Sequence, residues 1–321
     1  MRTVIFAGAL VAALGLPGPT VARSRAASDI CRATSVLAIR ACEADARAGK
    51  LVALGTCGNV SDAAAKKACT DQATADAKDV LKTCADERAV RQTSCKKLGP
   101  AAYEPPIDPA NFPLVPKIDN PFFPLTPGKT YVYEGQMQTG FEHDEFAITH
   151  NTKVIMGVTC VEVRDTVKTN GEVTEDTLDW FAQDNAGAVW YFGEHTMELV
   201  GGLATTLEGS FVTGIDRAKP GIIMEANPAV GDFYRQEFDL RNAEDFAEVT
   251  GLDETVTVPC GAAQGCTGSG TYDHVLKTSE TTPLEPDLHE DKFYVRDVGN
   301  LSTVNTDTGE TSKLVMIITA P

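Results

Sequence analysis

Residues 175–194 read EDTLDWFAQDNAGAVWYFGE, and the centre of this stretch decides the fold. Two segments rich in aromatic side chains flank Asp184-Asn185-Ala186-Gly187, whose composition is typical of a tight turn. We expect Gly187 to take the left-handed position of a three-residue hairpin loop, so that Asp184 pairs with Ala188. This register predicts three opposed pairs on one face of the hairpin: Trp180 with Phe192, Ala182 with Trp190, and Leu178 with Glu194.

Both faces of this hairpin carry aromatic side chains. A strand that is apolar on both faces is either buried between two layers or lines a ligand cavity. Glu194 is an exception on the Trp180 face, because a buried carboxylate needs a partner. The face opposite Trp180 holds Asp179, Phe181, Val189, Tyr191 and Gly193. If the hairpin lines a cavity, the ligand-binding residues are Trp180, Trp190, Tyr191 and Phe192.

The same alternation recurs through residues 129–321. Segments such as TYVYEGQM, FAITHNTKVI and HEDKFYVRD alternate apolar and polar residues, and turn signals such as TNGE and DTGE join several of them. No long helical pattern follows residue 130. The sequence therefore predicts a mainly β domain over 129–321, whose antiparallel sheet closes as a barrel or folds as a sandwich.

A proline-rich linker or arm precedes this domain, over residues 99–128. It contains nine prolines, too many for a helix or a central strand, so we expect extended chain. Its apolar residues indicate that part of the arm packs against a domain; they are Phe112, Leu114, Phe122, Phe123 and Leu125.

Six of the nine cysteines fall within residues 28–98, a region with helical composition. An even and dense set of cysteines predicts a disulfide framework, here a small stapled α-helical hairpin. We expect one helix from Ser28 or Asp29 to a stop at Gly49, and a second helix capped by Ser61 or Asp62.

The pairing of these six cysteines stays open, since they allow 15 connectivities. Cys31 and Cys42 share one helix face but lie about 16 Å apart along the axis, too far for a bridge. The rough register of a hairpin favours Cys42–Cys69, Cys31–Cys84 and, if the second helix bends or breaks, Cys57–Cys95.

Three cysteines lie outside the helical region. Cys160 sits in an apolar alternating segment, which predicts a buried free thiol. Cys260 and Cys266 flank a Gly-rich loop and are placed to close it with a disulfide.

The N-terminus predicts export. Arg2 precedes an uncharged apolar run over 4–16, and the small residues Thr20 and Ala22 predict cleavage of a signal peptide, residues 1–22. The run is too short to span a bilayer, so we expect no membrane span and a secreted or periplasmic protein. Removal of Arg2 changes the formal net charge from −17 to −18. Such acidity disfavours nucleic acid as a partner and can attract cations.

The motifs of common enzyme and nucleotide-binding classes do not occur. Histidine and carboxylate side chains can together hold a divalent metal ion, the one cofactor that the residue types suggest. His150 lies in an alternating segment where it can point inward with Ile148. The candidate metal ligands are His150, Asp179, Glu194, His195, Glu237 and Glu290.

Four blocks of the sequence resemble a group of uncharacterised secreted bacterial proteins: PLTPGKTYVYEGQ, EDTLDWFAQDNAGAVWYFGE, AKPGIIMEANPAVGDFYRQEF and TPLEPDLHEDKFY. The resemblance covers roughly residues 121–300 and implies an exported bacterial setting, with no particular activity. The cysteine-rich helices lie outside the resemblance, and the Cys260–Cys266 loop looks like an insertion.

Two interpretations of function remain, and whether the protein is an enzyme stays open between them. In the first, an exported binding protein takes a small or apolar ligand, or a metal ion, in a pocket of the β domain. In the second, the protein is a secreted hydrolase that depends on a metal or on carboxylates. An aromatic pocket with few titratable groups favours the first. Convergence of His150 with at least two other candidate ligands favours the second.

Overall fold

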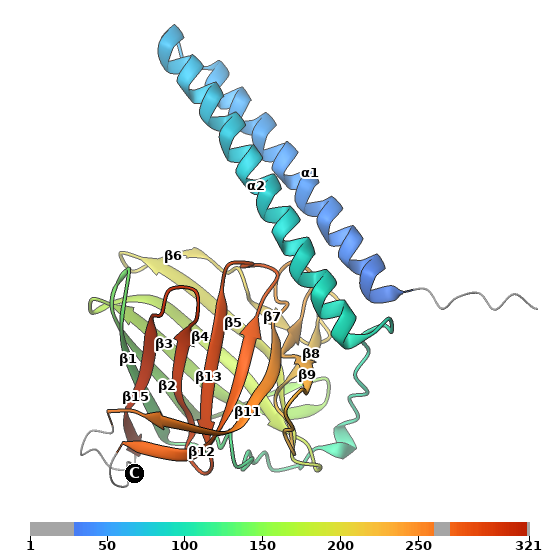
Figure 1. Ribbon diagram of the computed structural model, residues 1–321, viewed down its shortest axis with the longest axis vertical. Helices are drawn as coiled ribbons and strands as arrows, with labels where there is room; N and C mark the ends of the chain where they lie inside the picture. Colours follow the sequence, from blue (N-terminus) through green and yellow to red (C-terminus); the bar gives the residue numbers. More distant parts are fainter. Residues whose placement is uncertain (1–28, 260–269, 320–321) are drawn as a thin grey trace, which may run out of the picture.

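The computed structural model describes residues 29–259 and 270–319. Within these ranges a long helical hairpin projects from one end of a β barrel (Figure 1). The arrangement confirms the predicted fold class, and the barrel is the form that the sheet adopts. The predicted signal peptide and the predicted Cys260–Cys266 bridge lie outside the described residues.

The hairpin consists of α1 (Ile30–Gly58) and α2 (Ala63–Leu98). The side chains of Asp29 and Asp62 cap the two helices by accepting hydrogen bonds from backbone N–H groups, as the sequence predicts. The predicted stop at Gly49 is wrong, because α1 continues for nine more residues, to Gly58. Neither helix in the described part of the chain is apolar enough over a sufficient length to cross a membrane.

Three disulfides fasten the hairpin: Cys31–Cys95, Cys42–Cys84 and Cys57–Cys69. The predicted bridges Cys42–Cys69, Cys31–Cys84 and Cys57–Cys95 are therefore wrong, and α2 has no break. The error follows from the helix stop, because a turn placed at Gly49 shifts the register of one helix against the other. With the turn at residues 59–62, each bridged pair lies at the same height on both helices.

In the described part of the chain, fifteen strands build the barrel. They are β1 (Lys129–Met137), β2 (Gly140–Ile155), β3 (Val158–Thr169), β4 (Glu172–Gln183), β5 (Val189–Val200), β6 (Leu203–Thr206), β7 (Phe211–Val212), β8 (Lys219–Met224), β9 (Phe233–Arg235), β10 (Glu237–Phe238), β11 (Phe246–Thr257), β12 (Thr271–Thr281), β13 (His289–Val295), β14 (Gly299–Asn305) and β15 (Thr311–Thr319). Neighbouring strands are antiparallel, in the order β10-β8-β5-β4-β3-β2-β1-β15-β14-β13-β12-β11-β9, with β6 and β7 paired to β5.

The barrel is nearly closed, and a single residue of the chain links the two edge strands of its sheet. The two ends of the strand order, β9 and β10, are separated in sequence by Gln236 alone, so β9 pairs with β11 while β10 pairs with β8. Gly221 on β8 permits this close passage, because a Cβ atom there would lie 2.2 Å from the backbone carbon of Gln236.

The proline-rich arm packs against the barrel twice. Phe112, which follows the short 3-10 helix η1 (Pro109–Asn111), lies on the outer face of the sheet and contacts Phe192 edge to face. Phe122 and Leu125 belong instead to the core inside the barrel. Leu114, which the sequence also suggested as a packing residue, is 95% exposed. The arm therefore covers one wall and fills one end of the barrel.

Charged contacts anchor the hairpin to the barrel. The guanidinium of Arg91 is buried and donates to Glu87 on its own helix and to Glu244 of the barrel, each at 2.7 Å. Arg241 reaches Asp45 of α1 at 2.7 Å. Because buried charges need such partners, these contacts fix the position of the hairpin base.

Candidate functional site

The barrel contains a cavity of about 1060 Å³ whose lining is strongly acidic. Lys292 is the only lysine, arginine or histidine among the described residues of the lining. Twelve carboxyl groups face the same space: Glu142, Asp144, Asp165, Glu175, Asp179, Glu194, Glu237, Asp245, Glu280, Glu285, Glu290 and Glu310. The interior is therefore polar and rich in carboxyl groups rather than apolar.

The two ends of the cavity differ. At one end the lining includes Gln138 from the β1–β2 turn, Leu288 from the β12–β13 loop and Glu310 from the β14–β15 turn. These loops surround the mouth, and the backbone N–H of Gln138 donates to the carboxylate of Glu310 in the neighbouring turn. At the other end Leu125 of the arm and Val298 line the floor. A ligand would thus enter past the hairpin turns and stop at the arm.

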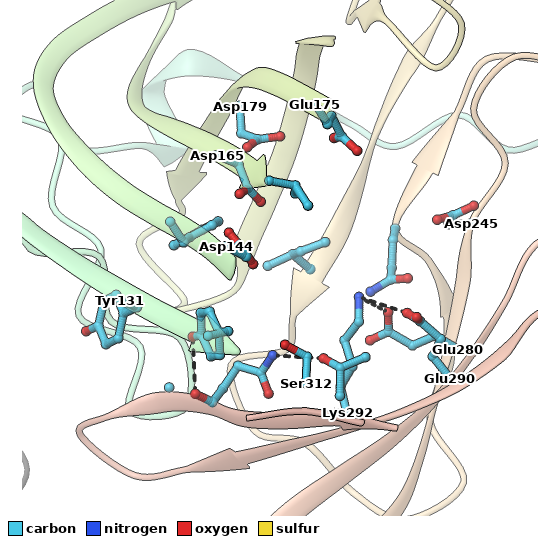
Figure 2. Close-up of a pocket in the computed structure, with 18 of the residues that line it drawn as sticks. Tyr131, Asp144, Asp165, Glu175, Asp179, Asp245, Glu280, Glu290, Lys292 and Ser312 are labelled. Atoms are coloured by element: carbon cyan, nitrogen blue, oxygen red, sulfur yellow. Dashed lines mark hydrogen bonds and ion pairs between the residues drawn. The ribbon is translucent and has the colours of Figure 1, made fainter. Parts of the chain in front are cut away.

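Asp144, Asp165 and Asp179 follow one another along one wall, on β2, β3 and β4 (Figure 2). Their side chains point inward because neighbouring residues of a strand face opposite sides, which sends Glu145 outward to Lys168. The Oδ1 atoms of Asp144 and Asp165 are buried, and the two side chains hydrogen-bond to each other, which requires one of them to keep its proton. Both side chains line the cavity.

Burial disfavours the ionised form of these carboxyls. It raises the pKa of Asp144 to about 6, helped by the charges of Glu142 and Glu175. Burial and the neighbouring charge of Asp144 hold the pKa of Asp165 well above its usual range. The pKa of Asp179 is also well above its usual range, again chiefly through burial. Asp165 and Asp179 therefore retain their protons at neutral pH until a positive charge arrives.

Next to this wall, Tyr191 on β5 donates a hydrogen bond of 2.5 Å to Asp179, and its ring stacks on Phe181 at 4.8 Å. Glu194 lies directly opposite Asp179 in the β4–β5 pair. Burial, followed by the charge of Asp179, raises the pKa of Glu194 to about 9. Burial and the charge of Asp245 raise the pKa of Glu237 well above its usual range.

The opposite wall carries Lys292, the one cationic side chain among the lining residues that the structure describes. The Nζ atom of Lys292 on β13 lies 2.8 Å from Glu280 and 3.8 Å from Glu290 (Figure 2). Burial lowers the pKa of Lys292, but the attraction of these carboxylates outweighs burial and places it well above its usual value. Two of the twelve carboxyls thus have an internal ammonium partner.

A β-bulge in β5 sets which residues face the cavity. The hairpin turn forms as the sequence predicts, with Asp184 bonded to Ala188 and Ala182 opposite Trp190. Beyond the bulge, however, Trp180 faces Gly193 rather than Phe192, and Leu178 faces His195 rather than Glu194. The extra residue turns Glu194 away from the Trp180 face and into the barrel, beside Asp179.

The structure divides the predicted ligand-binding residues between two places. Tyr191 lines the cavity. The other three belong to a second hydrophobic cluster on the outer face of β3–β5, beneath Phe112; they are Trp180, Trp190 and Phe192. Phe192 is fully buried there, whereas Trp180 also lines a smaller surface pocket, with Lys153 above its ring at 3.2 Å.

The predicted metal ligands divide in a similar way. Four carboxyls reach the cavity, from Asp179, Glu194, Glu237 and Glu290. His150 and His195 are exposed and do not converge with them, since neither lines the cavity. Within the described ranges, the one group of three potential ligand atoms within 4.8 Å of one another is Cys42, Cys84 and Glu87, whose two sulfurs form a disulfide.

The sequence interpretation missed Asp144, Asp165 and Lys292. Asp144 shares an alternating face with Phe146 and Ile148, but acids also occupy the other face of this strand, so the alternation alone does not identify it. Comparison of the chain with family models, with curated proteins and with solved structures finds no match. The resemblance to secreted bacterial proteins therefore stays a prediction.

Proposed function

We propose that this protein binds a small organic cation in the cavity of its barrel. The observation that carries the proposal is the excess of carboxyls inside the barrel, twelve against one lysine. Low-dielectric walls focus the field of such groups, and an ammonium inside the cavity interacts with several at once. This replaces the apolar ligand that the sequence suggested, because the aromatic residues behind that suggestion pack mainly on the outer face.

Two properties favour an organic cation over a bare metal ion. Calcium requires six to eight oxygen ligands around one point, and transition metals require several converging donors. The cavity carboxyls are spread over its walls, and no three of those in the described residues meet within 4.8 Å. The lining also includes Phe123, Phe146 and Phe181, which suit the apolar part of an organic ligand.

We further propose that the protein acts outside the reducing cytosol. Three disulfides in a hairpin of 69 residues, 30–98, support this setting, because cytosolic thiols are kept reduced. The predicted signal peptide agrees with it. N-terminal sequencing of protein recovered from culture medium or periplasm tests the proposal. A mature N-terminus at residue 23 is the expected result, and an intact Met1 in a cytosolic fraction contradicts it.

Titration calorimetry at pH 8 with three probes of matched length tests the binding function. The probes are 1,6-diaminohexane, hexane-1,6-diol and adipate, which carry two positive charges, no charge and two negative charges. We expect saturable binding of the diamine only, weakening as salt is added.

Two variants locate the binding. Asp179→Asn removes a carboxyl from the cavity and should weaken diamine binding at least tenfold. Asp76→Asn, on the exposed surface of α2, should leave binding unchanged. Equal binding of the diol, or equal effects of the two variants, would contradict the proposal.

One pair of carboxyls favours a second function, carboxylate-dependent hydrolysis. Asp179 and Glu194 face each other across β4 and β5, and Glu194 with a pKa of about 9 keeps its proton at neutral pH. Glycoside hydrolysis uses a proton donor beside a second carboxyl that is ionised, so this function requires Asp179 to lose its proton despite its raised pKa. Release of nitrophenol from a panel of aryl glycosides, lost in Glu194→Gln, would support this function. Absence of turnover by the wild-type protein would oppose it.

A further inference from the structure

We infer that the cation is a linear polyamine, held in extended form along the wall of β2, β3 and β4. The inference rests on the proposed cation binding and names the class of ligand. Its basis is the regular spacing of the carboxyls, the apolar residues beside them, and the way the barrel already binds its own lysine.

The carboxyls of this wall occupy successive rows of the sheet. The strand pairing places Glu142 in the first row, Asp144 and Glu175 in the second, and Asp165 in the third. Asp179 and Glu194 share the fourth row. Consecutive rows on one face are two residues apart, about 7 Å along the strands, so the series descends about 20 Å from mouth to floor.

This spacing suits ammonium groups separated by three or four methylenes. A compact cation would meet one row only, whereas a linear polyamine can place one nitrogen at each row. Beside the carboxyls, the wall presents Val167 in the second row and Phe146 in the third, and both can contact the methylene segments. Each of these rows thus offers a carboxyl and an apolar side chain next to each other.

Lys292 shows how this cavity holds an alkylammonium group. Its ammonium, on a stem of four methylenes, lies 2.8 Å from Glu280 and within 4 Å of Glu290. The facing wall has the same carboxyl chemistry, but none of its described lining residues is a lysine, arginine or histidine. A bound polyamine would supply ammonium groups to the wall of β2, β3 and β4, as Lys292 supplies one to Glu280 and Glu290.

Calorimetric titration of the purified mature protein with butylammonium, 1,4-diaminobutane, spermidine and spermine, at one ionic strength and pH 8, tests the inference. We expect affinity to rise at least tenfold with each added ammonium up to three. Mg²⁺ carries the same charge as the diamine and should compete at least tenfold more weakly than it.

Variants show whether the rows act together. Asp165→Asn should weaken spermidine at least tenfold and butylammonium less than threefold, because it interrupts the middle of the series. Asp144→Asn provides the same test at the second row should the first variant fold poorly. The matched control is Glu145→Gln, which changes the adjacent residue on the outer face and should leave every affinity unchanged.

The possible failures are distinguishable. If none of the four amines binds, both the proposed function and this inference fail. If all four bind with affinities within threefold of one another, or if Asp165→Asn weakens each of them equally, cation binding stands and the polyamine inference is overturned.

Discussion

Replacing Glu194 with glutamine should stabilise the barrel, and the gain should grow with pH. Burial and the charge of Asp179 raise the pKa of Glu194 to about 9 in the native protein. In the unfolded chain the pKa returns to about 4.3. Between these values the native protein keeps the proton and the unfolded chain loses it. Rising pH therefore favours the unfolded chain, and this contribution is complete once the pH passes the native pKa.

The expected size follows from the same two values. Each pH unit between the two pKa values lowers the free energy of unfolding by about 1.4 kcal/mol. The whole interval therefore lowers it by at most about 6 kcal/mol. Between pH 5.5 and 7.5 the wild-type protein should lose about 3 kcal/mol that the glutamine variant keeps. Glutamine preserves the shape of the side chain without a proton equilibrium, so the pH slope isolates the carboxyl.

Urea unfolding at pH 5.5, 6.5 and 7.5, followed by the fluorescence of Trp180 and Trp190, measures the difference. Glu198→Gln is the control, because it lies on the same strand with its side chain exposed. Its stability should follow that of the wild type at every pH. If the free energies of unfolding of Glu194→Gln and the wild type change in parallel with pH, the reasoning is refuted. That result would mean that Glu194 is ionised and solvated in the native protein.

Three further changes test the architecture. Arg91→Met leaves Glu244 buried without a cation and should cost about 3–5 kcal/mol in urea unfolding; a loss below 1 kcal/mol would contradict the buried pair. Gly193→Ala places a Cβ atom 2.3 Å from a backbone carbonyl of β7 and should lower the melting temperature by several degrees, so an unchanged value would oppose the bulge. Removal of the Cys42–Cys84 bridge by paired serines should cost about 4 kcal/mol, as its loop of about 42 residues implies. Non-reducing peptide mapping that finds any other pairing would contradict the hairpin register.

The sequence correctly predicted the features that depend on a few neighbouring residues. Caps at Asp29 and Asp62 depend on a side chain and a backbone N–H three residues away, and the turn before Ala188 depends on four residues. Alternation of polar and apolar residues was sufficient to predict an antiparallel sheet. Gly49 led to a wrong helix end, because an exposed glycine inside a helix destabilises it by only about 1 kcal/mol. The disulfides that the continuing helix forms stabilise the hairpin by more than that.

The cysteine spacing contained the correct answer. The residue numbers of each bridged pair add to the same total, since Cys31 with Cys95, Cys42 with Cys84 and Cys57 with Cys69 each give 126. An antiparallel hairpin of two regular helices requires this symmetry, because residues at equal distance from the turn lie side by side. The symmetry identifies the turn near residue 63 without any assumption about where a helix stops.

The acidic cavity could not be predicted in the same way. The residues that face it depend on the β-bulge in β5 and on strands that carry acids on both faces. Gly193 is the signal for the bulge, since an isolated glycine within a strand commonly marks one. Without the bulge, strict alternation places Glu194 beside Trp180 on the outer face. On β2, acids occupy both faces, so Asp144 inside and Glu145 outside have the same appearance in the sequence.

The distribution of apolar residues explains how a barrel with this interior remains folded. Leu276, Leu301 and Leu314 are fully buried in the core cluster inside the barrel, which also contains Phe122 and Leu125 of the arm, and a second cluster around Phe192 covers the outer wall. These two clusters supply the buried apolar surface that the carboxyl-lined walls of the cavity lack. The carboxyls near Asp165 weaken the empty barrel as the pH rises, yet the same ionisation strengthens their attraction for an ammonium ion. Stability of the empty protein and affinity for a cation therefore change in opposite directions with pH, which a packing role for these carboxyls would not produce.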